Sequence, residues 1–278
     1  MDRGAIERLS EFFERMNEAI PNNPEITELK AFVDRWKVDC LMVDPAAARS
    51  EPQNQYSQHR PSAIILIHGW GGTAEKSFGD LPNYIEKISK IPTFVYQYPT
   101  GWITASPSIA FIARNLDNWI RINAPGRRLC LVGHSMGGVI TRYLTIIQEI
   151  RTRPLKIRQI SLLASPTGGA AIANIASKLP FFRSAQLEEL NPNSSFLNEL
   201  NSRWHIWKNK NVPCNCHVGT MFAMNDAIVN YASAIGFDPD AVPIYNEDHQ
   251  SIVKPQSDTH DVVLTLARFL SESPLAKA

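Results

Sequence analysis

Short apolar runs and stretches of helical periodicity alternate along the chain from residue 62 onward. The run 63–67 is continuous and rich in β-branched residues, as in a strand that is buried on both faces of a parallel sheet. Further runs cover 93–96, 129–132, 157–163 and 214–221, and helical periodicity covers 76–90, 107–123, 136–150, the insertion 169–210 and 258–272. This alternation predicts an α/β fold in which helices cover both faces of a mostly parallel sheet, with ligands at the carboxyl ends of the strands.

The first 60 residues follow a different pattern. Their apolar residues recur at helical spacing, first at Ile6, Leu9, Phe13, Met16 and Ile20. A second helical stretch covers 25–36, and the polar, proline-bearing stretch 44–61 is typical of a linker. We therefore expect a helical extension and linker over 1–60, which packs on the body of the protein or mediates self-association, and one α/β domain over 61–278.

Composition and charge narrow the range of partners. Lys and Arg total 28 against 27 for Asp and Glu, so the net charge of +1 argues against binding to nucleic acid. No stretch approaches the roughly 20 apolar residues of a membrane span, and no apolar core of a signal peptide follows the N-terminal charges. We expect a cytoplasmic protein whose contact with lipid is at most peripheral.

Four cysteines are present, and none of them indicates a metal. Cys40 and Cys130 lie in apolar runs, as buried free thiols do. Cys214, Cys216 and His217 are crowded together, but successive side chains of a strand point to opposite faces and no second ligand pair follows at zinc-site spacing. The pattern favours a strand over a metal site.

A candidate nucleophile follows the run 129–132. Gly133, Ser135 and Gly137 form Gly-x-Ser-x-Gly between this predicted strand and the helix 136–150. A sharp turn from strand to helix strains the backbone at the serine, and the glycines remove Cβ atoms that would collide there. The motif also arises by chance, so the prediction depends on the strand and the helix that flank it. We predict that Ser135 is an exposed nucleophile at the sheet edge.

A glycine-rich turn, 68–72, follows the first strong strand. Glycines let the backbone approach a substrate carbonyl closely, so we predict an oxyanion hole formed by the backbone amides of Trp70 and of Met136, the residue after the serine. The alternatives are an ordinary turn and a phosphate loop. No lysine follows in the Gly-Lys-Ser/Thr form of a phosphate loop.

A serine nucleophile needs a histidine base, which after this type of turn comes last in the order Ser, Asp or Glu, His. Among the seven histidines, His205 falls in the insertion and His217 lies within a predicted strand, which leaves His249 and His260. His249 occupies a polar loop after a short extended run, whereas His260 precedes the last helix, where a capping or surface role is usual. We therefore assign the base to His249 and interpret His68 and His134 as structural neighbours of the glycine turns.

The carboxylate that orients the base is predicted to be Asp226. It closes the segment that follows the run 214–221, whereas the turn after 157–163 holds no carboxylate. Asp248 is adjacent to His249 and cannot easily reach around to its ring, so it either faces solvent or orders the loop. The alternative role for Asp226 is the N-cap of a stretch that begins at Ala227.

Together these segments resemble the α/β-hydrolase superfamily, in its lipase-like group with the SERAC and PGAP proteins and related bacterial lipases. The matching segments are 68–72, 96–99, 133–138, 165–169, 190–201, Asp226 and His249 with 252–255. The resemblance runs from about residue 62 to the C-terminus and implies hydrolysis or transfer of acyl groups on lipids and other carboxylic esters, without a cofactor. The chain departs from the pattern at Thr167, where relatives often have a histidine after the proline.

The leading hypothesis is a serine ester hydrolase in which Ser135 attacks an ester, His249 moves the proton and Asp226 orients His249. The apolar side chains of 169–210 either cover the site as a helical cap, which favours an apolar acyl chain, or complete the helical layer. Two alternatives are a lipid acyltransferase that uses the same residues and a non-catalytic binding module with a hydrolase fold.

Overall fold

The computed structural model describes residues 60–100, 107–167, 185–209, 216–229, 231–235, 238 and 240–271. The predicted N-terminal extension, apart from Arg60, lies outside these residues, and so do residues 169–184 and 210 of the insertion. The domain boundary near residue 60 and the role of the extension therefore stay predictions.

Six parallel strands form one sheet in the order β2-β1-β3-β4-β5-β6. The strands are β1 (Ala63–Ile67), β2 (Thr93–Tyr96), β3 (Arg128–His134), β4 (Lys156–Leu163), β5 (His217–Ala223) and β6 (Val242–Ile244). The chain moves from β1 to β2 on one side and then returns to β3 on the other side of β1. This reversal makes the carboxyl ends of β1 and β3 the natural crevice for a ligand.

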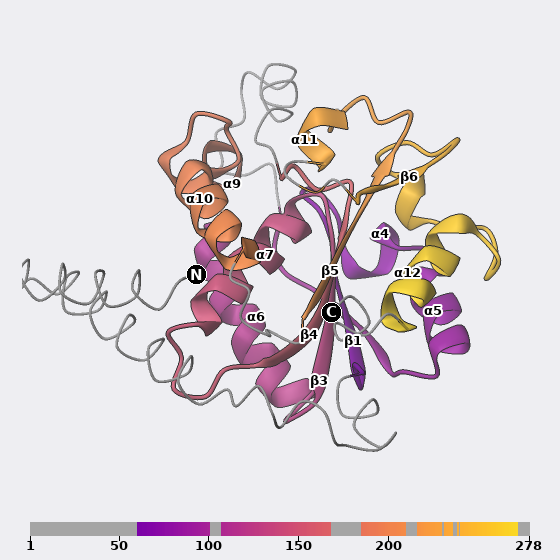
Figure 1. Cartoon of the computed structure of the whole chain (residues 1–278), viewed down its shortest axis with the longest axis horizontal. Helices are drawn as coiled ribbons and strands as arrows, with labels where there is room; N and C mark the ends of the chain where they lie inside the picture. The colour runs from indigo at the N-terminus through magenta and orange to yellow at the C-terminus, as the bar shows by residue number, and fades with distance from the viewer. Residues whose placement is uncertain are drawn as a thin grey trace, which may run out of the picture. The chain divides into compact units, whose positions relative to one another are not determined.

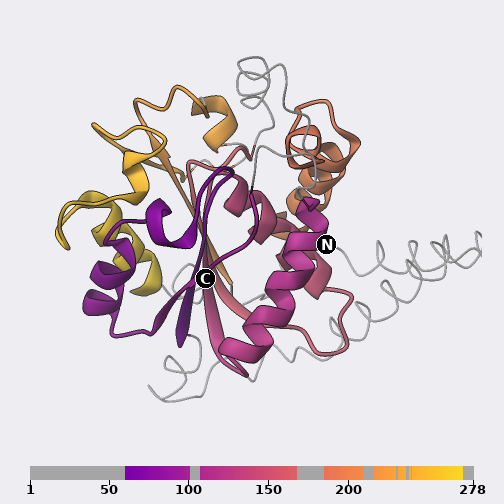
Figure 2. The same ribbon diagram turned by 180° about the vertical axis from the view of Figure 1, so that it is seen from behind.

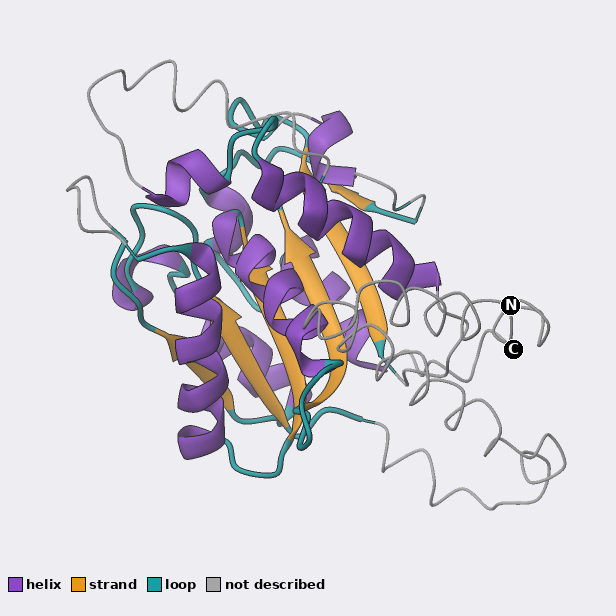
Figure 3. Ribbon diagram, turned by 90° about the vertical axis from the view of Figure 1, so that its left-hand side faces the viewer, coloured by secondary structure: helices purple, strands orange, loops and turns teal. Residues whose placement is uncertain are grey.

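Helices cover both faces of the sheet (Figures 1 and 2). One face carries α6 (Ile109–Asn123), α7 (Met136–Gln148), α9 (Ala185–Glu189) and α10 (Ser195–Asn209), and Figure 3 looks onto this side. The other face carries α4 (Ala74–Ser77), α5 (Leu81–Ser89) and α12 (Asp261–Ser271). The short helix α11 (Tyr231–Ile235) and the 3-10 helix η2 (Ser251–Val253) lie in the segments that follow β5 and β6.

Strand β1 shows why a continuous apolar run is needed at the centre of the sheet. All five of its residues are buried. Ile65 and Ile67 belong to the apolar cluster beneath α6 and α7, whereas Ile64 and Leu66 belong to the cluster beneath α5 and α12. Alternate side chains thus fill two cores, so both faces of the strand must be apolar.

One helical prediction needs correction, and one alternative for the insertion gains support. The segment 76–90 is two helices, because Gly79, with a φ of +49°, turns the chain between α4 and α5. In the insertion, the described part 185–209 completes the helical layer: Leu190, Leu197 and Leu200 are buried in the cluster that holds α7. A cap over the site would have to come from the remainder, 169–184, which lies outside the described residues.

A buried arginine joins α10 to α7. Arg142 is 1% exposed, its Nη2 donates a hydrogen bond to Oδ1 of Asn201 at 2.6 Å, and its guanidinium lies 5.4 Å from the ring centroid of Trp204. Burial lowers the pKa of Arg142 to about 9. The insertion is thereby attached to the same helix that begins at the candidate nucleophile.

Candidate active site

Ser135 lies at the junction of β3 and α7, as the motif predicts. Its φ of 53° and ψ of −124° are unusual for a residue with a side chain. Its backbone N–H donates to the carbonyl of Leu163 on β4 at 3.0 Å, which fixes the strained turn to the sheet. Contrary to the expectation of an exposed side chain, Ser135 is only 9% exposed, and both Gly69 and His249 lie against it.

The motif glycines permit close packing of the turn. A Cβ atom at Gly137 would lie 2.1 Å from the carbonyl oxygen of Ile67 on β1, and one at Gly133 would lie 2.5 Å from the Cα of Gly138. Both contacts are with backbone atoms, which have little freedom to move away. The glycines therefore let helix α7 begin directly against the ends of the central strands.

The structure brings His249 to Ser135. Nε2 of His249 lies 3.0 Å from Oγ of Ser135, although 114 positions separate them in the sequence. The imidazole is buried, with the residue 5% exposed. This geometry lets the hydroxyl donate its proton to a neutral imidazole.

Asp226 completes the arrangement and also caps the turn that follows it, although no helix begins at Ala227. Its Oδ2 lies 2.8 Å from Nδ1 of His249, and its Oδ1 accepts hydrogen bonds from the backbone amides of Ile228 at 2.8 Å and Val229 at 2.7 Å. One oxygen holds the imidazole while the other caps the turn that follows. The carboxylate is thereby fixed in position toward His249.

The remaining polar residues near His249 order its loop. Oδ1 of Asp248 accepts from the amides of Gln250 and Ser251, both at 2.8 Å, and these bonds lower the pKa of Asp248. His260, the rival candidate for the base, instead pairs its Nε2 with Oε1 of Glu247 at 3.0 Å. Both residues therefore stabilise the loop and do not contact Ser135 in the structure.

The predicted oxyanion donors belong to two segments that lie beside Ser135. Met136 is the first residue of α7, so its amide has no partner within the helix and lies at the positive end of the helix dipole. Gly69, next to Trp70, packs so closely that a Cβ there would lie 2.9 Å from Cβ of Ser135. The loop that carries Trp70 therefore passes beside Ser135, and its assignment as a donor stays a proposal.

Sequence reasoning gave no role to the aromatic support of this loop. His68 stacks on Tyr98 with ring centroids 4.1 Å apart, its Nδ1–H donates to the carbonyl of Gly69 at 2.9 Å, and the Tyr98 hydroxyl donates to the carbonyl of His68. Burial lowers the pKa of His68 and raises that of Tyr98. The segment 96–99 is part of the family match in the sequence, and this match is the signal that points to Tyr98.

The departure at Thr167 has a structural consequence that leaves the triad geometry intact. Its hydroxyl lies 3.0 Å from the backbone carbonyls of both Ser233 and Ala234. The threonine thus ties the turn after β4 to helix α11, a role that a hydroxyl fills with a single proton shared between two acceptors.

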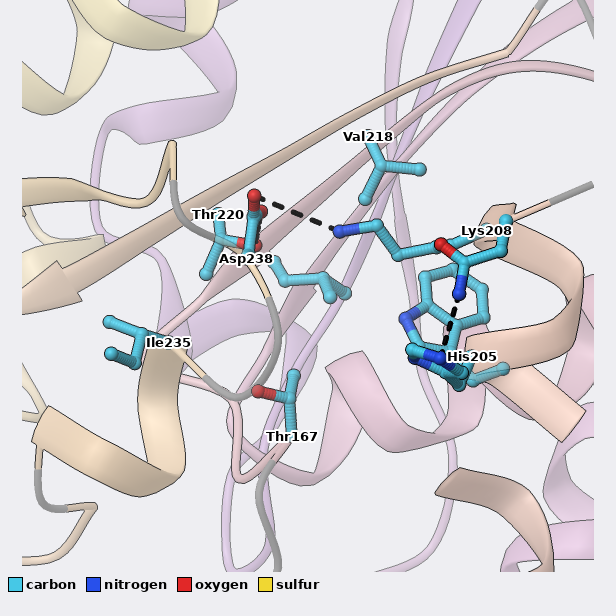
Figure 4. Close-up of a pocket in the computed structure, with 10 residues that line it drawn as sticks. Thr167, His205, Lys208, Val218, Thr220, Ile235 and Asp238 are labelled. Carbon is cyan, nitrogen blue, oxygen red and sulfur yellow. Dashed lines mark hydrogen bonds and ion pairs between the residues drawn. The ribbon is translucent and has the colours of Figure 1, made fainter. Parts of the chain in front are cut away.

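A separate pocket lies between α10, α11 and the strands β4 and β5 (Figure 4). Its lining includes Asp238, which accepts a hydrogen bond from Oγ1 of Thr220 at 2.6 Å and lies 3.7 Å from Nζ of Lys208. Ser135, Asp226 and His249 are not among its lining residues. Its acid and its cation balance each other, and the pocket holds no serine or cysteine nucleophile.

Two further findings concern the described part of the chain. It contains no cluster of three or more His, Cys, Asp or Glu residues that could hold a metal ion. Within the same residues, no helix is long and apolar enough to cross a membrane.

Comparisons with known proteins agree with the fold. Residues 109–203 match the family described as PGAP1-like alpha/beta domain, and no curated protein sequence matches the chain. Three solved structures align with a TM-score of 0.50. Phospholipase PlaB from Legionella pneumophila is 21% identical over 62% of this chain and 40% of its own, so the match spans less than half of PlaB. Mouse alpha/beta hydrolase domain-containing protein 10 is 19% identical, over 75% and 89%, and Paleococcus ferrophilus monoacylglycerol lipase is 14% identical, over 76% and 95%.

These likenesses establish the architecture. The chain has the α/β-hydrolase fold, and the resemblance seen in its sequence is confirmed at that level.

Proposed function

We propose that the protein is a serine ester hydrolase of the lipase-like type, which cleaves carboxylic esters through an acyl-enzyme on Ser135. The observation that carries this proposal is the continuous set of contacts from Ser135 Oγ through His249 to Asp226, at 3.0 Å and 2.8 Å. The three residues follow the chain order that the strand-to-helix turn requires. Hydrolase-fold relatives that are named as lipases support the same reaction class.

In the first half of the reaction, Oγ of Ser135 attacks the ester carbonyl carbon while Nε2 of His249 takes the hydroxyl proton. The carbonyl oxygen becomes an oxyanion, which the amides of Met136 and Trp70 would stabilise. Collapse of the tetrahedral intermediate breaks the ester C–O bond. His249 gives its proton to the departing alkoxide, which leaves as the alcohol, and the acyl group stays on Ser135.

In the second half, water attacks the acyl carbon and gives a proton to His249. The bond to Ser135 then breaks, the acid leaves, and the proton returns to Oγ. Throughout, Asp226 keeps Nδ1 of His249 protonated and stabilises the transient imidazolium. Transfer to an alcohol instead of water would use the same residues and differ only in this half.

The test is hydrolysis of p-nitrophenyl esters of graded chain length by the wild type, Ser135→Ala and a control, Ser202→Ala. Ser202 is exposed on α10, and its hydroxyl bonds only the backbone of its own helix. We expect Ser135→Ala to lose at least a thousandfold in kcat/KM and the control to match the wild type. Equal rates for wild type and Ser135→Ala would refute the proposal.

Chain-length dependence tests the expected preference for an apolar acyl group, which would appear as a rise in kcat/KM from acetate to longer esters. Labelling of Ser135 by a fluorophosphonate separates an enzyme from a non-catalytic binding module. Product analysis with an added alcohol separates hydrolysis from transfer, because transfer yields new ester in excess of free acid.

A further inference from the structure

His134, the last residue of β3, contacts the loop that carries the proposed base. Its Nε2 lies 2.8 Å from the backbone carbonyl oxygen of His249, and the two imidazole rings are 4.9 Å apart at 44°. A carbonyl oxygen only accepts hydrogen bonds, so Nε2 of His134 carries the proton. The side chain beside the nucleophile therefore donates to the backbone of the base itself.

The surroundings of His134 keep its ring neutral. The residue is 4% exposed, and burial, with the neighbouring His249, His68 and Lys254, lowers its pKa to about 3. Among the described residues, no carboxylate acts on the pKa of its ring, and Asp226 bonds Nδ1 of His249 instead. His134 thus stays an uncharged donor over the pH range in which a histidine base works.

The other ring nitrogen of His134 faces the proposed donor loop. A Cβ at Gly69 would lie 3.3 Å from Nδ1 of His134 and 2.9 Å from Cβ of Ser135. The imidazole therefore fills the space among the nucleophile, the donor loop and the histidine loop.

Asp226 and Ser135 contact the imidazole of His249, whereas the other bonds described above for this loop involve neighbours of His249. The carbonyl of Glu247 accepts from the amide of Asn225, and Asp248 caps the turn that follows it. His134 instead bonds the carbonyl group of His249, which is attached to the Cα atom that carries the imidazole. A change at this contact moves the ring directly.

We propose that His134 is a positioning residue, whose hydrogen bond to the carbonyl of His249 sets the distance between Nε2 of His249 and Oγ of Ser135. The inference rests on the proposed function. Its physical basis is that proton transfer requires heavy atoms about 2.6–3.2 Å apart, and small displacements cost rate.

The experiment compares His134→Phe, which keeps a ring but has no donor, with His134→Gln, whose side-chain amide can donate to the same carbonyl. Matched controls are His217→Phe and His217→Gln. His217 begins β5 and packs against the ring of Phe269, at 5.4 Å between centroids, away from Ser135. Each variant is measured for kcat and KM on a p-nitrophenyl ester, for its pH profile, and for its Tm.

We expect His134→Phe to lower kcat by about tenfold or more with KM within twofold, and His134→Gln to recover most of the loss. We also expect nitrogen-15 NMR of the wild type to show a His134 imidazole that is protonated on Nε2, as the bond at 2.8 Å requires. Because burial lowers its pKa, the ring should not titrate between pH 5 and 8. In His134→Phe, the signals of the His249 ring should shift, whereas the His217 variants should leave them unchanged.

Three results would overturn the inference. These are wild-type kcat in His134→Phe, an equal loss in the Phe and Gln variants that follows their Tm, and a His134 ring whose Nε2 carries no proton. Failure of the proposed function is distinct, because wild-type protein would then show no Ser135-dependent turnover or fluorophosphonate label. If the wild type is active and labelled and His134→Phe has the same kcat, the positioning role alone is rejected.

Discussion

Gly137→Ala tests whether close backbone packing positions the nucleophile. The added Cβ would lie 2.1 Å from the carbonyl oxygen of Ile67 and 2.6 Å from that of His68, against a lower limit of 3.0 Å for real contacts. Both neighbours are backbone atoms at the end of the central strand β1. To relieve the clash, the start of α7 must therefore move by about 1 Å.

The expected loss of stability is the difference between two opposing effects. Overpacking against a rigid neighbour costs about 3 kcal/mol, and the better helix propensity of alanine returns up to about 1 kcal/mol. The net loss of about 2 kcal/mol corresponds to a fall in Tm of about 4–8 °C for a domain of this size. A displacement of this kind at Ser135 is also expected to lower kcat on the order of 100-fold.

Gly126→Ala is the matched control. Gly126 has a φ of +68°, but no atom lies within 4 Å of the position of its Cβ. The alanine therefore costs about 1 kcal/mol of backbone strain without a clash, with kcat unchanged. Calorimetry and ester hydrolysis measure both variants, and Gly137→Ala with a Tm within 2 °C and a kcat within twofold of wild type would refute the reasoning.

Three further predictions follow from the same contacts. Asp226→Asn should lower kcat on the order of 10⁴-fold, because the imidazole loses its anionic partner. The Tm should change little, because an amide oxygen can still accept from the backbone amides of Ile228 and Val229. A loss of activity together with a large fall in Tm would contradict this prediction. The free energy of unfolding should fall as the pH drops below 6.5, because burial lowers the pKa of His134 in the folded protein to about 3 and the unfolded chain then binds one more proton. Urea titrations at several pH values should therefore show that the free energy of unfolding depends less on pH in His134→Gln, by about one proton. Parallel pH curves for the wild type and His134→Gln would refute this prediction. Burial raises the pKa of the Cys130 thiol to about 12. Peptide mapping after treatment with iodoacetamide at pH 8 should therefore find Cys130 unmodified in native protein and modified in urea. Labelling of this thiol in native protein would contradict its burial.

The strands were predicted well because their signal is local and strong. Strands β1 and β2 have the predicted bounds, 63–67 and 93–96, and a parallel strand buried on both faces leaves a continuous apolar run in any sequence. Helix bounds were less certain. The break between α4 and α5 depends on the φ of Gly79, and α11 has only five residues, too few to show a helical period.

The candidate triad could be ranked from the sequence because each member must follow a strand in a known order. The sequence offered Asp226 either as the partner of His249 or as a helix N-cap, whereas in the structure one oxygen bonds His249 and the other caps a turn. It also set His134 aside as a neighbour of the nucleophile. The partner of that ring is a backbone carbonyl 115 positions away, and no local pattern marks such a contact.

The sequence by itself determined the alternation of strands and helices, the strained turn at Ser135 and the identity of the residues available to act with it. These depend on periodicity, on glycine conformation and on chain order, all of which are properties of short segments. Only the tertiary structure decided that Ser135 is nearly buried, that the segment 185–209 belongs to the helical layer, and that His134 holds the loop of His249. Those outcomes depend on where strand ends and loops distant in the sequence meet, which packing of the whole domain decides.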